Sequence, residues 1–164
     1  MNNEPLWLAA ARGDIGLREL PGAPTAPKIA QWLKELGAWW RDDETPWCGT
    51  AVAAWMKVSD IARAKHWYRA KGWLDWGVPL GGPVVGAVVV FERAGGGHVG
   101  LVVGKDPAER LLVLGGNQGD SVRISAFDPH RVVGYRWPAE RAQSVPVGPL
   151  PVYSGGVAMS TDEA

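Results

Sequence analysis

The chain has a single cysteine, no excess of either charge and no long apolar run. One cysteine among 164 residues rules out an internal disulfide framework and a cysteine-based zinc cluster. The 17 basic and 17 acidic side chains cancel, which argues against attachment to nucleic acid or an anionic membrane through bulk charge. The longest apolar run, residues 83–91, is too short to span a bilayer. We therefore expect neither a nucleic-acid partner nor stable membrane insertion.

Tryptophan, in contrast, is abundant. The chain has ten, and nine of them precede residue 77. Rings at this density indicate a core built from aromatics or a groove that grips something flat or sugar-like. Apolar residues make up 46% of the chain and charged residues 21%, which is typical of a globular protein with a packed core.

Hydrophobic periodicity and breaker residues divide the chain into a helical half and a strand-rich half. We expect helices over residues 4–12, 29–36, from Thr45 onward and over 61–71, and strands over 84–92, 98–104, 111–114, 121–125 and 132–137. Helices followed by closely spaced strands predict an α+β domain, residues 1–138, with an antiparallel sheet. Residues 139–164 are rich in Pro and Gly, and we interpret them as a C-terminal tail or linker.

The lone cysteine lies where a helix should begin. Thr45 is a good N-cap residue and Pro46 suits the first helical position, so Cys48 falls in the first turn. Unpaired backbone N–H groups and the positive end of the helix dipole lie there, and both lower a thiol pKa. A single cysteine is also commonly a small buried apolar residue, so partners are needed to support a nucleophile.

A cysteine nucleophile needs a base, usually His, and a third polar group that orients the His. His98 follows a triple-glycine turn and opens a predicted strand, from which its ring can face a helix packed on the sheet. Asn117 ends the next strand, and antiparallel pairing can bring it beside His98. Gln118 and Asp120 are the alternatives, because a predicted strand boundary shifts by one or two residues.

Three residues near these positions are candidates for substrate binding. Trp47 adjoins the nucleophile and lines either a substrate groove or the core. Asp43 either lines the site or belongs to a solvated loop, and Gln118 lies next to the proposed orienting residue. We expect no metal or other cofactor, since the three His are 32 residues apart and no His-Glu-x-x-His motif occurs.

Three segments together resemble a known family. Asp43–Gly49, Gly97–Gly100 followed by an apolar strand, and Gly115–Gln118 are similar to the CHAP/NlpC-P60 group of cysteine peptidases and amidases, with the greatest likeness to its small phage-type lysins. The likeness extends over roughly residues 5–138. Many members have Gly-Asp ahead of the apolar strand where this chain has Gly86-Ala87, which puts one hydrogen bond of the family in doubt.

The resemblance implies a papain-like α+β fold with N-terminal helices packed on an antiparallel sheet. It also implies hydrolysis of amide bonds in peptidoglycan, by an endopeptidase or an N-acetylmuramoyl-L-alanine amidase. Cys48 would be the nucleophile, His98 the base and Asn117 the orienting residue, without a cofactor. The resemblance leaves open which amide bond is cut.

The expected biology is that of a phage or prophage endolysin, monomeric and acting beside a holin. Two alternatives stay open: an interbacterial toxin amidase of the same fold with an immunity protein, and a non-catalytic phage structural or wall-binding module. The first residues lack the basic start and apolar stretch of a secretory signal. We therefore expect cytoplasmic accumulation until a pore or delivery device gives access to the periplasm and cell wall.

Overall fold

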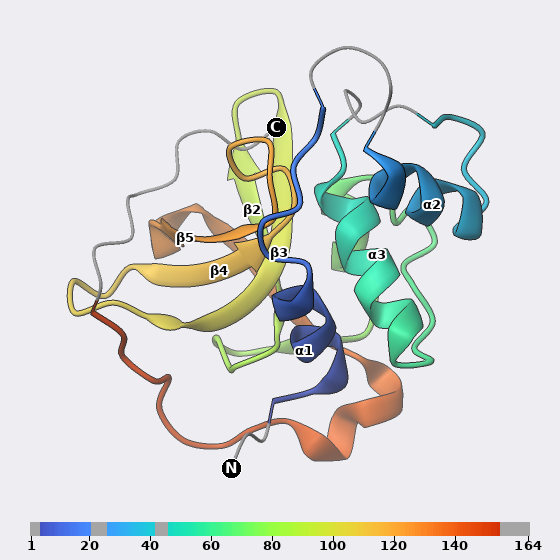
Figure 1. The fold of residues 1–164 in the computed structure, drawn as a ribbon. Helices are drawn as coiled ribbons and strands as arrows, with labels where there is room; N and C mark the ends of the chain where they lie inside the picture. The colour runs from blue at the N-terminus through green and yellow to red at the C-terminus, as the bar shows by residue number, and fades with distance from the viewer. Residues whose placement is uncertain (1–3, 21–25, 42–45, 155–164) are drawn as a thin grey trace.

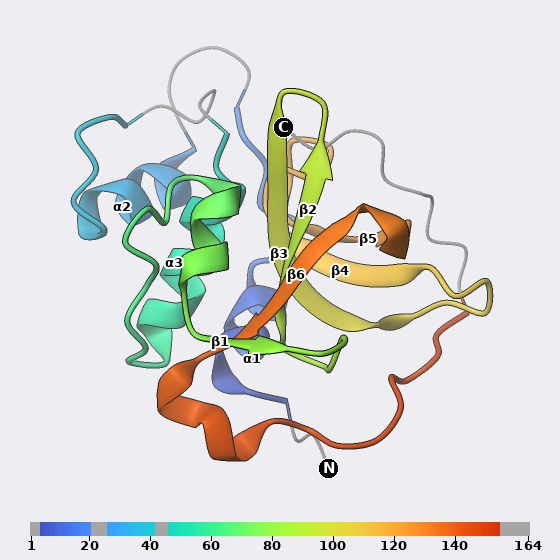
Figure 2. The ribbon, with the colours of Figure 1, turned by 180° about the vertical axis from the view of Figure 1, so that it is seen from behind.

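The structure, a computed structural model, describes residues 4–20, 26–41 and 46–154. Within these residues, three α-helices precede a six-stranded sheet: α1 (Leu6–Gly13), α2 (Pro27–Glu35) and α3 (Cys48–Val58). Figure 1 shows α2 and α3 together on one side of the sheet, and Figure 2 shows the same arrangement from behind. The predicted α+β class is confirmed. None of the described helices is long and apolar enough to cross a membrane.

All neighbouring strands of the sheet are antiparallel, in the order β1-β6-β2-β3-β4-β5. Their bounds are β1 (Val78–Leu80), β2 (Val88–Arg93), β3 (Gly96–Lys105), β4 (Leu111–Gly115), β5 (Arg123–Phe127) and β6 (Val132–Trp137), and the short 3-10 helices are η1 (Ala70–Asp75), η2 (Pro129–Arg131) and η3 (Ala139–Ser144). In the register of β3, His98 lies opposite Phe91 of β2. The histidine predicted to open a strand therefore lies on an interior strand of the sheet.

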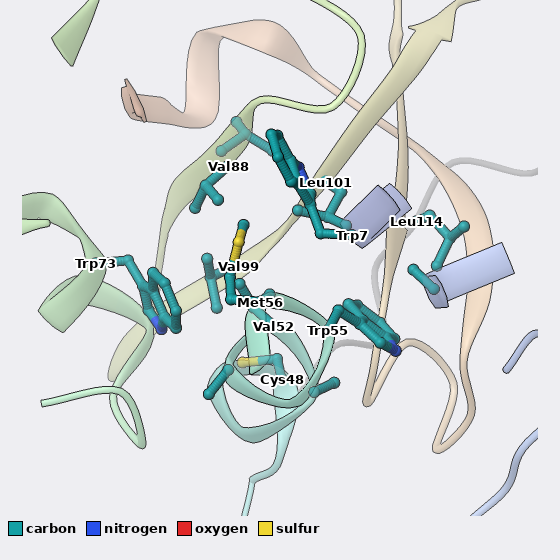
Figure 3. Close-up of a cluster of buried hydrophobic side chains, with 14 of the residues drawn as sticks. Trp7, Cys48, Val52, Trp55, Met56, Trp73, Val88, Val99, Leu101 and Leu114 are labelled. Atoms are coloured by element: carbon teal, nitrogen blue, oxygen red, sulfur yellow. The ribbon is translucent and has the colours of Figure 1, made fainter. Parts of the chain in front are cut away.

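Helix α3 is buried on nearly every side, because its residues from Cys48 to Met56 are all apolar or small. Figure 3 shows Val52 and Met56 of this helix beside Val99 of β3, with Trp55 and Trp73 on its flanks. Burying each large side chain of this kind stabilises the fold by about 1.5–3 kcal/mol. Any shift of α3 along the sheet would open this core, so the helix holds its first residue in a defined place against β3.

The helix predicted over residues 61–71 is wrong. The chain there forms turns and irregular backbone, and only the 3-10 helix η1 follows. Tryptophan side chains replace the missing helical bonds, since the Trp73 indole N–H donates to the carbonyl of Trp67 at 3.1 Å. Because the Trp67 carbonyl already accepts this bond, it does not need a helical N–H as partner. The sequence pattern of this segment therefore does not require a helix.

The expected strand over 84–92 begins only at β2. Gly86 has a φ of +91° in a turn that precedes the strand, and its carbonyl accepts the Trp7 indole N–H at 2.8 Å. Strand β1, which pairs with β6, was not predicted because its three residues are too few to show a period. The other predicted strands lie within two residues of β3, β4, β5 and β6.

The segment expected to be a tail, residues 139–164, is packed on the domain as far as the structure describes it. Its first part forms η3, and the N–H of Tyr153 donates to the carbonyl of Lys105 at the end of β3, at 2.8 Å. Val145 and Leu150 pack against the core. The boundary predicted at residue 138 therefore does not separate a packed part from an unpacked one; residues 155–164 lie outside the described residues.

Candidate active site

Cys48 is the first residue of α3, in the first turn as predicted, although the cap differs from the prediction. Trp47 takes the N-cap position, with its carbonyl accepting the N–H of Ala51 at 3.0 Å. Pro46 lies before the helix rather than at its first position, and Thr45 is outside the described residues. The thiol is nearly buried, with 4% of the residue exposed.

The surroundings of the Cys48 thiol do not lower its pKa, although its position at a helix start predicted that they would. Burial raises the pKa of the Cys48 thiol, because removing water penalises the thiolate more than the thiol. Hydrogen bonds from the backbone N–H groups of Val99 and Gly49 and the positive charge of Arg93 act in the lowering direction, but they are the smaller effects. The predicted depression of the pKa is therefore wrong, and the reason is desolvation.

The bond from Val99 also places the thiol relative to the histidine. Val99 follows His98 directly on β3, so the sulfur lies against the strand at the residue next to the imidazole. His98 is fully buried, and its ring stacks on Phe127 of β5 with centroids 5.4 Å apart and planes 14° apart. The sheet thus holds the imidazole plane in one orientation beside the start of α3.

Gln118 determines which nitrogen of His98 carries a proton. The His98 Nε2 atom lies 2.9 Å from Oε1 of Gln118. The amide nitrogen of Gln118 donates to the carbonyls of Val113 and Arg123, at 3.2 and 2.7 Å, so the amide oxygen must face the ring. An amide oxygen only accepts, so Nε2 is protonated and Nδ1 is the ring atom able to take up a proton.

Asn117 was expected to orient His98, and this prediction is corrected by the structure. Its Oδ1 instead accepts the backbone N–H of Trp47 at 3.0 Å. Asn117 has a φ of +60°, so the chain turns sharply after β4, and the neighbouring residue, Gln118, reaches the ring. Asn117 fastens this turn to the start of α3, directly before Cys48. Asp120, the other alternative, is exposed, and its carbonyl accepts the N–H of Glu19 at 3.0 Å.

Of the other residues proposed to bind substrate, Trp47 belongs to the core. Only 1% of it is exposed, and its indole N–H donates to Oε1 of Glu19 at 3.0 Å. A Cβ atom added at Gly116 would lie 2.7 Å from the Trp47 ring, so the turn after β4 passes close over it. Trp47 thus stabilises the start of α3 by packing in the core. Asp43 lies outside the described residues.

A cavity of about 290 Å³ opens at Cys48. Its wall combines the cysteine with the glycine turn between β2 and β3 and with a basic rim, made of Arg69, Lys71 and Arg93. Lys71 forms an ion pair with Glu92. These basic residues and Tyr68, which also lines the cavity, were not predicted, because nothing in their local sequence pattern distinguishes them from ordinary surface residues.

The described residues contain no group of three or more His, Cys, Asp or Glu side chains placed to hold a metal ion. What the site offers is a desolvated thiol at a helix start, an imidazole of fixed tautomer on the adjoining strand, and a cationic opening. This set of groups can carry out nucleophilic acyl transfer, in which a thiol attacks a carbonyl with the help of a base.

One family model matches part of the chain. Residues 39–117 match the family model of the CHAP domain. CHAP domains are generally hydrolases that act on peptidoglycan, so the match supports a place in the CHAP superfamily of peptidases and amidases. The matched segment contains both Cys48 and His98. No curated protein and no solved structure matches the chain.

Proposed function

We propose that the chain is a cysteine hydrolase of amide bonds in peptidoglycan, with Cys48 as nucleophile and His98 as general base. One observation carries the proposal: the Cys48 thiol opens into a cavity at the start of α3 and contacts β3 beside an imidazole that Gln118 orients. The CHAP match supports the substrate class.

The first half of the reaction forms a thioester. His98 takes the thiol proton on Nδ1 while the sulfur of Cys48 attacks the amide carbonyl, so that a C–S bond forms and the carbonyl electron pair moves to oxygen. Backbone N–H groups without helical partners, including that of Cys48 itself, stabilise the oxyanion at the start of α3. The C–N bond then breaks, and His98 gives its proton to the leaving amine.

The second half regenerates the enzyme. His98 takes a proton from water, whose oxygen attacks the thioester carbonyl. The C–S bond breaks, the thiolate of Cys48 recovers the proton from His98, and a carboxylic acid leaves. Each turnover therefore consumes one water molecule and one amide bond and yields one amine and one acid.

The raised thiol pKa decides how the first step proceeds. Burial favours the protonated thiol of Cys48 over the thiolate in the resting site. The proton must then move during the attack, and the imidazole must already present Nδ1. Gln118 is accordingly a positioning residue for His98, and Asn117 is a positioning residue for the helix start that carries Cys48.

Hydrolysis of purified peptidoglycan tests the proposal. Wild-type protein should lower the turbidity of a peptidoglycan suspension and release new amino termini, and Cys48→Ala should release none. Lys57→Ala is the matched control, since Lys57 is exposed near the opposite end of α3. Equal activity of wild type and Cys48→Ala would overturn the mechanism, whereas binding of peptidoglycan by the wild type without hydrolysis would favour a non-catalytic wall-binding module.

We extend the proposal to a bacteriolytic role of the endolysin type, in which the enzyme meets its substrate only outside the inner membrane. The expected partner is then a holin-like pore. Expression in a bacterial host should lyse cells when the chain is fused to a periplasmic export signal and not when it stays in the cytoplasm. Export of Cys48→Ala, which should leave cells intact, controls for damage by the exported protein itself.

A further inference from the structure

A second hollow adjoins the Cys48 cavity, and its walls are largely aromatic. This aromatic groove has a volume of about 560 Å³ and is lined chiefly by Trp39, Trp40, Trp67 and Tyr68. Its size falls within the range of roughly 300–1,000 Å³ that holds small ligands. Tyr68 lines both the groove and the Cys48 cavity. A substrate that lies in the groove can therefore extend past Tyr68 into the cavity that contains the nucleophile.

The rings form a floor and a wall. Trp40 stacks on Trp67 with centroids 5.9 Å apart and planes 20° apart, and Trp67 is buried, so this floor is part of the core. Trp39 stands nearly perpendicular to Trp40, at 74°, and 89% of it is exposed. Core packing does not explain an indole so exposed, and clustered exposed apolar surface marks ligand-binding grooves.

Cationic and polar side chains hold the other rings. The guanidinium of Arg63 lies 5.9 Å from the ring centre of Trp67, and that of Arg69 lies 5.7 Å from the ring centre of Tyr68. The Tyr68 hydroxyl lies 3.2 Å from Nδ1 of His66. A ligand would therefore meet rings that are already ordered, which lowers the entropic cost of binding.

We propose that the aromatic groove binds an N-acetylhexosamine ring of the peptidoglycan glycan strand and so directs Cys48 to the amide bond that joins sugar to peptide. The proposal rests on the hydrolase function proposed above. A pyranose presents a flat face of C–H groups that suits an indole floor, and its polar edge stays in water.

Charge complementarity assigns the two hollows to different parts of one substrate. The Cys48 cavity has the basic rim of Arg69, Lys71 and Arg93, which suits the carboxylates of a stem peptide. Among the described residues, the aromatic groove has no charged side chain in its lining, so it suits an uncharged ring rather than the carboxylates of a peptide. With the sugar in the groove and the peptide in the cavity, the bond between them lies at Tyr68, beside the nucleophile.

A binding measurement tests the aromatic groove, and an analysis of the reaction products tests which bond is cut. The Cys48→Ala protein should sediment with glycan strands stripped of their peptides, and adding Trp39→Ala should weaken this binding roughly tenfold. Tyr153→Ala is the matched control, because Tyr153 is half exposed and hydrogen-bonds to Lys105, away from the groove. Mass spectrometry of peptidoglycan digested by the wild type should find the new amino terminus on the first residue of the stem peptide and a free carboxylate on the sugar.

Failure of this inference can be told apart from failure of the hydrolase function. If peptide-free strands do not bind, or if the new termini lie within the stem or cross-bridge, the groove assignment is wrong even though hydrolysis stands. If the Cys48→Ala protein binds strands through Trp39 while the wild type hydrolyses nothing, the hydrolase function fails and the bond assignment fails with it. A melting temperature unchanged by Trp39→Ala ensures that a loss of binding reports the groove.

Discussion

The candidate site has a buried layer and an outer layer, and the two are held in different ways. The buried layer is Cys48, His98 and Gln118, all nearly or fully enclosed and fixed by helix packing, ring stacking and an amide with three defined bonds. The outer layer consists of the side chains that rim the two hollows, Trp39, Tyr68, Arg69, Lys71 and Arg93. These are exposed or half exposed and are held by a few contacts each.

The difference separates chemistry from recognition. Bond making needs one tautomer and one geometry. Gln118 sets the tautomer of His98, and packing against the aromatic ring of Phe127 sets the orientation of its ring. Recognition of a large polymer requires side chains that the substrate can contact, so the recognition residues of the outer layer lie at the exposed rim. Changes in the buried layer should therefore lower kcat, and changes in the outer layer should raise KM, which gives the comparison a measurable form.

After loss of the nucleophile itself, the largest effect is expected at the base. His98→Gln should lower kcat by about a thousandfold or more, because the glutamine amide cannot take up the thiol proton as the proposed base does. Initial rates of amine release over a range of peptidoglycan concentrations would show the split between kcat and KM. Retained kcat with a raised KM would place His98 with the recognition residues and contradict the division into two layers.

The two adjacent residues after β4, Asn117 and Gln118, should respond differently to replacement by alanine. Gln118→Ala should lower kcat by about 10- to 100-fold and change the pH profile of kcat, since the tautomer of His98 is then no longer imposed. Asn117→Ala should instead lower the melting temperature and kcat with an unchanged pH profile, because it frees the start of α3. Identical pH profiles for both variants would contradict the separate roles.

The sequence predicted much of the buried layer because its residues obey local rules. Cys48 was placed correctly in the first turn of a helix although the predicted cap was wrong, and His98 was found from its place after a glycine turn. For the orienting residue the sequence favoured Asn117 and kept Gln118 as an alternative, and the structure selects Gln118. Asn117 has a positive φ, and no sequence pattern fixes how a turn rotates two adjacent side chains. The direction of the thiol pKa was also missed, because burial is a property of the whole fold.

The outer layer could not be predicted in the same way. Tyr68, Arg69 and Lys71 lie in or next to the segment that the apolar spacing assigned to a helix, and Trp side-chain bonds replace that helix. They meet Arg93 only because the turn between β2 and β3 comes back over them. The abundance of tryptophan did point to a core or a sugar-like groove, and the structure shows Trp47 in the first and Trp39 at the edge of an aromatic groove.

Alkylation of the thiol links the two layers. Since burial raises the pKa of Cys48, the thiolate fraction should keep growing as the pH rises through and beyond neutrality, and the rate with iodoacetamide should rise with it. Arg93 acts in the lowering direction, so Arg93→Gln should raise the pKa further and slow alkylation by a few-fold at any given neutral pH. A rate that is already constant below pH 7 would mean a resting ion pair with His98 instead.

The smallest effects are expected at the basic rim. Arg69→Gln and Lys71→Gln should each raise KM by about two- to fivefold and leave kcat unchanged, because exposed charges contribute under about 1 kcal/mol apiece and are screened by salt. Lys71→Gln should have the lesser effect, since the ion pair with Glu92 already offsets its charge. Lys57→Gln, the same change at the other end of α3, should leave both constants unaltered. KM should be measured at low and at high salt. If the rim attracts peptide carboxylates, the KM values of Arg69→Gln and Lys71→Gln should approach that of the wild type as salt increases. A difference in KM that persists at high salt would instead mean that these side chains support the structure of the buried layer.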